Sequence, residues 1–163
     1  MSGPLNQESV IRVRETLARL GATGEIRHLD ESARTATEAA NALGIEVGQI
    51  ASSLIFLANS RPVLVIASGA HRVDTERLSR VLSGAIIDKA NATGVRIATG
   101  FAIGGVAPVG HPEALRTVVD TALSQFETVW AAAGHPHCVF PTTYDELLRI
   151  TGGEAAEVGE EPN

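Results

Sequence analysis

The 163-residue sequence has few of the residue types that mark several common kinds of functional site. Cys138 is its only cysteine, which excludes an internal disulfide and a cysteine-rich metal site and favours a small buried hydrophobe. No apolar run reaches the roughly 18 residues that a membrane-spanning helix needs. Residues 1–7 have no basic segment before an apolar one, so no signal peptide is predicted. We therefore expect a cytoplasmic protein without a membrane partner.

Aromatic residues and lysine are also scarce. The four Phe, one Trp and one Tyr leave the core to be built from Val, Ile, Leu and Ala. Lys89 is the only lysine among 13 basic residues, and the formal net charge is −6. This balance gives little attraction for nucleic acid, so we expect no DNA partner and only local contacts with RNA. Acidic residues gather in residues 154–163, which are predicted to be a disordered acidic tail.

The five histidines do not follow the spacing of a metal site. H-E-x-x-H and H-x-E with C-x-x-C are both absent, so we expect no metal and no cofactor. The pair in His135-Pro136-His137 is interpreted as two exposed turn residues, with adventitious metal binding as the alternative. The G-x-S-x-G turn of serine hydrolases is absent as well.

Hydrophobic periodicity predicts a single α+β domain over residues 8–153, preceded by a flexible N-terminus over residues 1–7. Helices are expected at residues 8–20, 35–43, 74–82, 91–98 and, after a cap at 142 or 143, up to 150. Strands are expected at residues 26–29, 49–57, 62–68, 85–89, 116–119, 128–132 and 137–140. The 49–57 and 62–68 strands are nearly continuously apolar, which favours central places in a mixed, curved sheet or partial barrel with helices outside.

The most informative segment is the Gly-rich loop, residues 99–111. Four glycines and Pro108 fall within eleven of its residues, between two stretches of regular structure. Glycine permits positive φ and close approach to bare N–H groups, and proline stiffens the loop. Backbone amides of this kind bind an oxyanion, a carboxylate or a phosphate. A tight connection is the alternative, while the absent Gly-Lys-Ser/Thr ending and the glycine spacing argue against a nucleotide loop.

Five segments occur in an order and spacing that resembles one known family. They are Gly104-Gly105-Val106-Ala107-Pro108, residues 35–44, residues 50–56 with 62–66, residues 71–74, and residues 117–120 with 126–129 and Gly134. Together they resemble the YbaK/ProX family of aminoacyl-tRNA deacylases, stand-alone relatives of the editing domain inserted in bacterial prolyl-tRNA synthetases. The similarity extends over residues 8–152.

The resemblance implies trans-editing, the hydrolysis of the ester at the 3′ end of a mischarged aminoacyl-tRNA. It assigns oxyanion stabilisation to the backbone amides of Gly104, Gly105, Val106 and Ala107, next to Pro108, and assistance of the attacking water to the terminal ribose hydroxyl. An aminoacyl-tRNA synthetase is a further candidate partner. One alternative is a non-catalytic module of the same fold that binds a tRNA end or a small acyl ligand. Another is an unrelated hydrolase or small-molecule binder with this fold.

On the substrate side the resemblance points to Ala51, Ser52, Asp120, Gly134 and His135. The family usually has a lysine in the aminoacyl pocket at the place of Ser52, and Lys89 lies elsewhere in the chain. The resemblance thus implies a roomier, neutral pocket at that wall. Strand alternation predicts that Ser52 or its neighbour Ser53 faces the cleft. The alternative for Asp120 is a helix or turn cap for residues 121–123, and the alternative for Gly134 is a simple turn.

Overall fold

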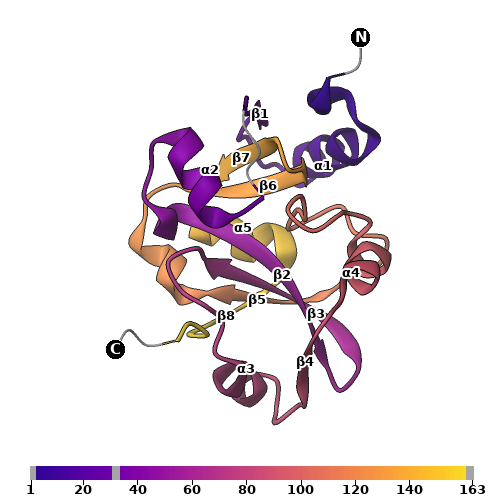
Figure 1. The fold of residues 1–163 in the computed structure, drawn as a ribbon, viewed down its shortest axis with the longest axis vertical. Helices are drawn as coiled ribbons and strands as arrows, with labels where there is room; N and C mark the ends of the chain where they lie inside the picture. The colour runs from indigo at the N-terminus through magenta and orange to yellow at the C-terminus, as the bar shows by residue number, and fades with distance from the viewer. Residues whose placement is uncertain (1–2, 31–33, 161–163) are drawn as a thin grey trace.

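The computed structural model describes residues 3–30 and 34–160, which form one mixed sheet surrounded by helices (Figure 1). The strand order is β1-β7-β6-β2-β3-β5-β8, and β4 pairs with β2 beside this path. The strands are β1 (Arg27–His28), β2 (Ile50–Ala58), β3 (Arg61–Ser68), β4 (Ile87–Lys89), β5 (Arg116–Asp120), β6 (Val129–His135), β7 (Cys138–Thr142) and β8 (Glu154–Ala156). The helices are α1 (Glu8–Arg19), α2 (Ala36–Leu43), α3 (Thr75–Val81), α4 (Ala92–Thr99) and α5 (Tyr144–Thr151), with 3-10 turns η1 (Pro4–Asn6), η2 (Val47–Gln49) and η3 (Thr121–Gln125). The predicted α+β class is confirmed.

Local capping chemistry sets the helix ends that frame the site. α2 begins with the predicted capping box, in which Thr35 and Glu38 each accept the other's backbone N–H, and it ends at left-handed Gly44. α4 begins where the Asn91 side chain accepts the Gly94 N–H, and it ends at Gly100 with φ 78°. The Gly-rich loop therefore starts from a fixed helix end.

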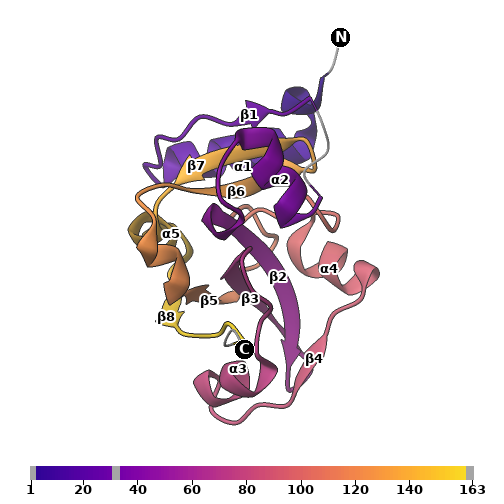
Figure 2. The ribbon, with the colours of Figure 1, turned by 60° about the vertical axis from the view of Figure 1, so that its left-hand side comes forward.

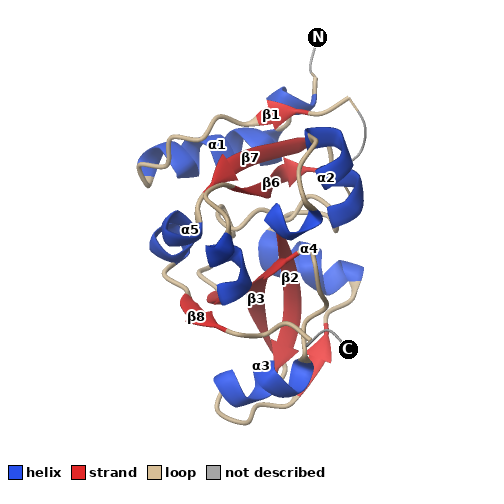
Figure 3. Cartoon of the chain, turned by 90° about the vertical axis from the view of Figure 1, so that its left-hand side faces the viewer, coloured by secondary structure: helices blue, strands red, loops and turns tan. Residues whose placement is uncertain are grey.

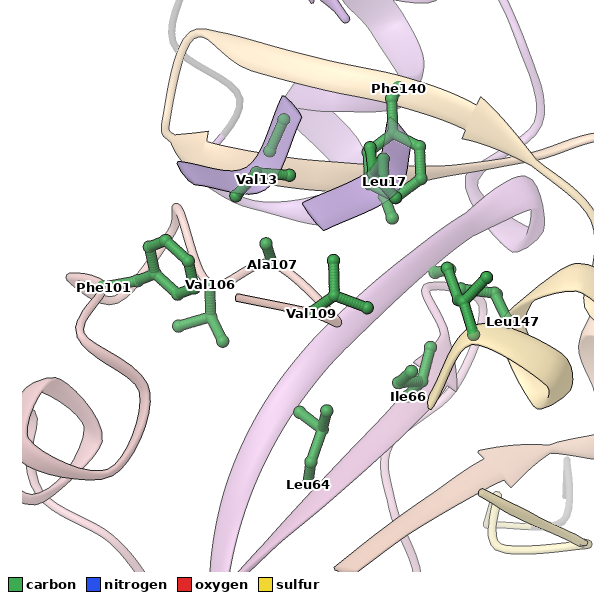
Figure 4. Packing of buried hydrophobic residues seen from close by; sticks show 14 of the residues in the cluster. Val13, Leu17, Leu64, Ile66, Phe101, Val106, Ala107, Val109, Phe140 and Leu147 are labelled. Carbon is green, nitrogen blue, oxygen red and sulfur yellow. The ribbon is translucent and has the colours of Figure 1, made fainter. Parts of the chain in front are cut away.

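Every residue of β3 from Val63 to Ser68 is buried, because the strand lies between two hydrophobic clusters. Leu64 and Ile66 face a main core shared with α1, α5 and β7. Val63, Val65 and Ala67 face a second core under α3. Figure 4 shows the α1 and β7 side chains above those of β3 in the main core. Figure 3 shows α1 and α3 at opposite ends of the molecule. The predicted central position of this strand is confirmed.

The C-terminal segment corrects the sequence prediction of a disordered tail. Glu154–Ala156 form β8, which pairs in parallel with β5. Val158 is fully buried in the second core, and its carbonyl accepts the Asp74 N–H at 2.7 Å. Figure 2 shows the segment in yellow crossing above α3. The prediction failed because it was based on acidic composition and gave no weight to Val158. Residues 161–163 of the predicted tail lie outside the described chain.

The N-terminal boundary also differs from the prediction. Pro4–Asn6 form the turn η1, and Leu5 packs against the main core. Ordered structure therefore begins ahead of Glu8, where the sequence placed the start of the domain; residues 1–2 lie outside the described chain.

Candidate active site

The middle of β2 has an open edge. On one side β2 pairs with β3 from Ala51 to Ala58. On the other side it pairs with β6 only at Ile50 and Ala51, and with β4 only at residues 56–58. Residues 52–55 lie between these two contacts with no strand partner on that side in the described chain. Figure 2 shows β2 passing from β6 to β4 with α4 beside it.

A cavity of about 1060 Å³ lies along this edge. Residues 51–56 of β2 form one wall, and Ile103, Gly104 and Val106 of the Gly-rich loop form another. The fold thus brings Ala51 and Ser52 together with two residues of the G-x-x-x-P loop. Further lining comes from α2, from β6 and from the turn that follows β3.

Both serines of β2 line the cavity, but they point to opposite faces of the sheet. In the register Ser52 lies opposite Ala67, on the second-core side, and Ser53 lies opposite Ile66, on the main-core side. The Ser53 hydroxyl is buried and has no hydrogen-bond partner among the described residues. The Ile55 carbonyl accepts the Ala90 N–H across the open edge, so the backbone groups of Ser53, two residues away, point to that edge too.

The side chains of the Gly-rich loop anchor it in the main core. Val106 and Val109 are each 5 % exposed and Ala107 is fully buried (Figure 4). Gly104 has φ 92°, a conformation that favours glycine. A Cβ on Gly105 would lie 3.0 Å from the His135 backbone, so the loop passes β6 too closely for a side chain.

The amides of this loop differ in availability. The Gly105 N–H donates to the Ala102 carbonyl at 3.0 Å and is already used in a turn. In the described chain, the N–H groups of Gly104, Val106 and Ala107 have no such acceptor. Pro108 is buried, lies outside the cavity lining and has no N–H to offer. Three of the four predicted donors therefore remain, two of them from buried residues, where an unpaired N–H group is uncommon.

His111 forms a hydrogen bond with a backbone carbonyl of the Gly-rich loop. Its Nε2 bonds the Ala107 carbonyl at 2.8 Å, so the neutral ring carries its proton on Nε2. Burial lowers the pKa of His111 below its usual value, and the nearby Arg12 cation lowers the pKa further. The folded protein therefore favours the neutral ring.

This preference predicts a pH-dependent contribution to stability. Because the folded-state pKa is depressed, the unfolded chain binds more protons below the ordinary histidine pKa of 6.5, and stability falls as the pH decreases below that value. His111→Gln keeps a donor but cannot titrate. We expect the variant's loss of unfolding free energy between about pH 7.5 and about pH 5 to be smaller than that of the wild type. Denaturant titrations at both pH values measure this; equal losses would contradict it.

Asp120 does not line the main cavity, although it lines a second, smaller cavity next to His71. It is fully buried and accepts the Ser68 and Ala122 N–H groups, each at 3.0 Å, so the turn-cap interpretation holds for it. It also contacts His71 Nε2 at 2.5 Å. His71 lines both the main cavity and this second cavity, of about 300 Å³. Asp120 thus orients a side chain of the site instead of meeting a ligand in the main cavity.

Gly134 and His135 lie behind the Gly-rich loop and do not line the main cavity. Gly134 has φ 97°, and a Cβ there would lie 2.8 Å from the Ser9 carbonyl, so this glycine allows α1 to pack on β6. The His135 ring accepts the His137 N–H at Nδ1. Burial and then the neighbouring His137 lower the pKa of His135. These two residues support the loop from outside the cleft.

Three basic side chains, Arg34, Arg72 and Lys89, line the cavity and are exposed. None of them makes a salt bridge within the residues described. Lys89 is far from Ser52 in sequence, but its strand pairs with β2 opposite Phe56. No local sequence pattern indicates this proximity, because it depends on a strand pairing between Lys89 and Phe56, which lie far apart in the chain.

Other candidate chemistry is limited. Cys138 is buried, and burial raises the pKa of its thiol to about 11, which fits the hydrophobic role predicted for it. Over residues 3–30 and 34–160 no three His, Cys, Asp or Glu side chains are arranged to hold a metal ion. In the same part of the chain no helix combines the length and apolar character needed to cross a bilayer.

The fold and the cavity define a class of protein, a single α+β domain with a cleft between a strand edge and a Gly-rich loop. A solved structure described as a candidate trans-editing enzyme for prolyl-tRNA synthetase is 41 % identical, with TM-score 0.89, covering 95 % of this chain and 99 % of that one. The profile of the aminoacyl-tRNA editing domain matches residues 30–150. The chain belongs to this family, as its resemblance to YbaK/ProX proteins indicated.

Two relatives show the range of the family. EbsC of Enterococcus faecalis, named as a candidate Cys-tRNA(Pro)/Cys-tRNA(Cys) deacylase, is 24 % identical over 125 residues, 76 % of each chain. The proline–tRNA ligase of Latilactobacillus sakei is 31 % identical over 149 residues, 85 % of this chain but 25 % of the ligase. This chain therefore corresponds to about a quarter of that larger enzyme.

Proposed function

We propose that this protein is a trans-editing deacylase that hydrolyses the ester of a mischarged aminoacyl-tRNA. The observation that carries the proposal is the set of unpaired N–H groups at Gly104, Val106 and Ala107, beside a cavity along the open edge of β2. In ester hydrolysis the carbonyl oxygen becomes an oxyanion, and preorganised backbone donors stabilise it more than the ground state. Family membership and the relatives named above support the same reaction.

The β2 edge supplies the complementary half of the proposed site. The backbone groups of Ser53 point to this open edge and can bond a polar group of the acyl substrate. Ala51 and Ser52 are small, so the wall they form leaves room for the amino-acid side chain. The attacking water is assisted by the terminal ribose hydroxyl of the tRNA, which removes the need for a protein general base at the carbonyl.

We assign RNA contact to a rim of three basic side chains, Arg34, Arg72 and Lys89, at this cavity. Asp74, Glu76 and Glu160 line the same cavity and the net charge of the chain is −6, so the attraction for phosphate is confined to those three side chains. Arginine pairs well with phosphate oxygens, and lysine acts as a point charge. Contacts restricted to this rim suit the 3′ end of a tRNA, with an aminoacyl-tRNA synthetase as a further proposed partner.

The decisive experiment is a deacylation assay with a panel of tRNAs, each charged with a non-cognate amino acid. We expect hydrolysis of at least one member well above the spontaneous rate, and no change on adding EDTA, since no metal-ligand cluster exists among the described residues. Binding of an aminoacyl-tRNA without hydrolysis of any member would favour the non-catalytic module. Activity removed by EDTA and restored by zinc would contradict metal-independent chemistry.

Ser52→Lys is expected to change which aminoacyl group is preferred while leaving the fold intact. Ser52 is half-buried, lines the cavity and makes no side-chain hydrogen bond with described residues, so a lysine has space for its ammonium. The panel gives the substrate profile, and the Tm reports folding.

Ser53→Lys is the matched control on the same strand. Its side chain faces the main core, where an unpartnered ammonium costs several kcal/mol, so we expect a large fall in Tm. A stable Ser52→Lys protein with an unaltered profile would contradict the pocket role of Ser52, and a strongly destabilised one would assign Ser52 to the core.

A further inference from the structure

One side chain of α1 contacts both ends of the Gly-rich loop. Arg12 Nε donates to the Gly110 carbonyl at 2.8 Å, and Arg12 Nη2 donates to the Gly100 carbonyl at 3.4 Å. The guanidinium lies over the Phe101 ring, 4.7 Å from its centroid. Arg12 thus joins residues ten positions apart at the base of the loop.

The loop is shaped to receive this guanidinium. A Cβ on Gly100 would lie 2.8 Å from Arg12 Nη2, so a side chain there would displace the contact. The Phe101 ring is only 1 % exposed and is therefore a fixed platform for a stacked cation. Hydrogen bonds from a charged donor are stronger than neutral ones, and the planar guanidinium is well suited to bridging two carbonyls.

We propose that Arg12 is a positioning residue that closes the base of the Gly-rich loop and thereby fixes the place of Gly104 and Val106, which line the cavity with unpaired N–H groups. Its role in catalysis rests on the proposed deacylase function. A flexible base would leave these donors to reorient during the reaction, and a displacement of about 1 Å at such a site costs up to about 100-fold in rate. Arg12 itself does not line the cavity, so it acts through the loop.

Arg14 provides a matched control on the same helix, because its Nη2 donates to the Leu5 carbonyl, away from the loop. Amide hydrogen exchange of residues 100–111 measures how firmly Arg12 holds the loop, and it needs no substrate. We expect Arg12→Ala to speed exchange there about tenfold, and Arg14→Ala to leave it unchanged. Exchange unchanged in Arg12→Ala would overturn the proposal.

The catalytic arm uses the best substrate of the mischarged panel. We expect Arg12→Ala to lower kcat about tenfold with KM within about twofold, Arg12→Lys to fall less, and millimolar guanidinium to restore part of the Arg12→Ala rate. Faster loop exchange with an unchanged kcat would overturn the positioning role. A wild-type protein that hydrolyses no member of the panel would overturn the deacylase function and the catalytic role together, while the exchange result would still decide whether Arg12 holds the loop.

Discussion

Removal of residues 154–163 is expected to lower the Tm by more than about 10 °C and to promote aggregation. The truncation deletes β8, uncovers the outer edge of β5 and opens the second core at Val158. An uncovered strand edge is a template for intermolecular pairing. The contact of Gly159 with the His71 ring is lost as well, so one wall of the cavity loses its support.

Val158→Ala isolates the packing part of this effect. Its side chain is fully buried, and deleting two methyl groups from a packed core costs about 2 kcal/mol, or roughly 4–8 °C in Tm for a chain of this size. Glu154→Gln is the control, since it removes only an exposed ion pair with Arg116 and should change stability by less than about 0.5 kcal/mol. Calorimetry of the wild type and the three variants measures the series. A truncated chain with the wild-type Tm would show that the segment is dispensable.

Gly105→Val is expected to reduce deacylation at least tenfold and to lower the unfolding free energy by about 1–3 kcal/mol. Any Cβ here lies 3.0 Å from backbone atoms of His135, which cannot yield as a flexible side chain can. The loop must therefore move away from β6. Val106 and Ala107 leave their buried places with it, and their N–H groups lose the aim that the proposed oxyanion site requires.

Gly94→Ala is the matched control for this substitution. Gly94 lies in α4 without a positive φ, and a Cβ there approaches the Asn91 side chain at 3.3 Å and the Ala90 side chain at 3.8 Å, with no backbone atom in the way. We expect this variant to retain wild-type turnover and Tm. Turnover of Gly105→Val close to that of the wild type would identify the segment as a connector only and contradict the proposed mechanism.

Sequence motifs predicted part of the candidate site. The loop and the β2 segment were each visible in the sequence, and the fold places them on facing walls of one cavity. Asp120 and Gly134 were visible too, but their positions follow from packing: Asp120 serves buried N–H groups and His71, and Gly134 serves contact with α1. A polar or glycine position in a motif does not distinguish a ligand contact from a structural one.

The sequence by itself determined the helices, the central hairpin and the position of the Gly-rich loop, because these depend on capping residues, alternation and glycine within a few neighbours. Only the tertiary structure decided what surrounds that loop. Arg12 and Lys89 reach the site through contacts between segments far apart in the chain, and the C-terminal strand forms because Val158 finds a buried place in a core built by others. Such contacts depend on the summed packing of the whole domain, which no local pattern contains.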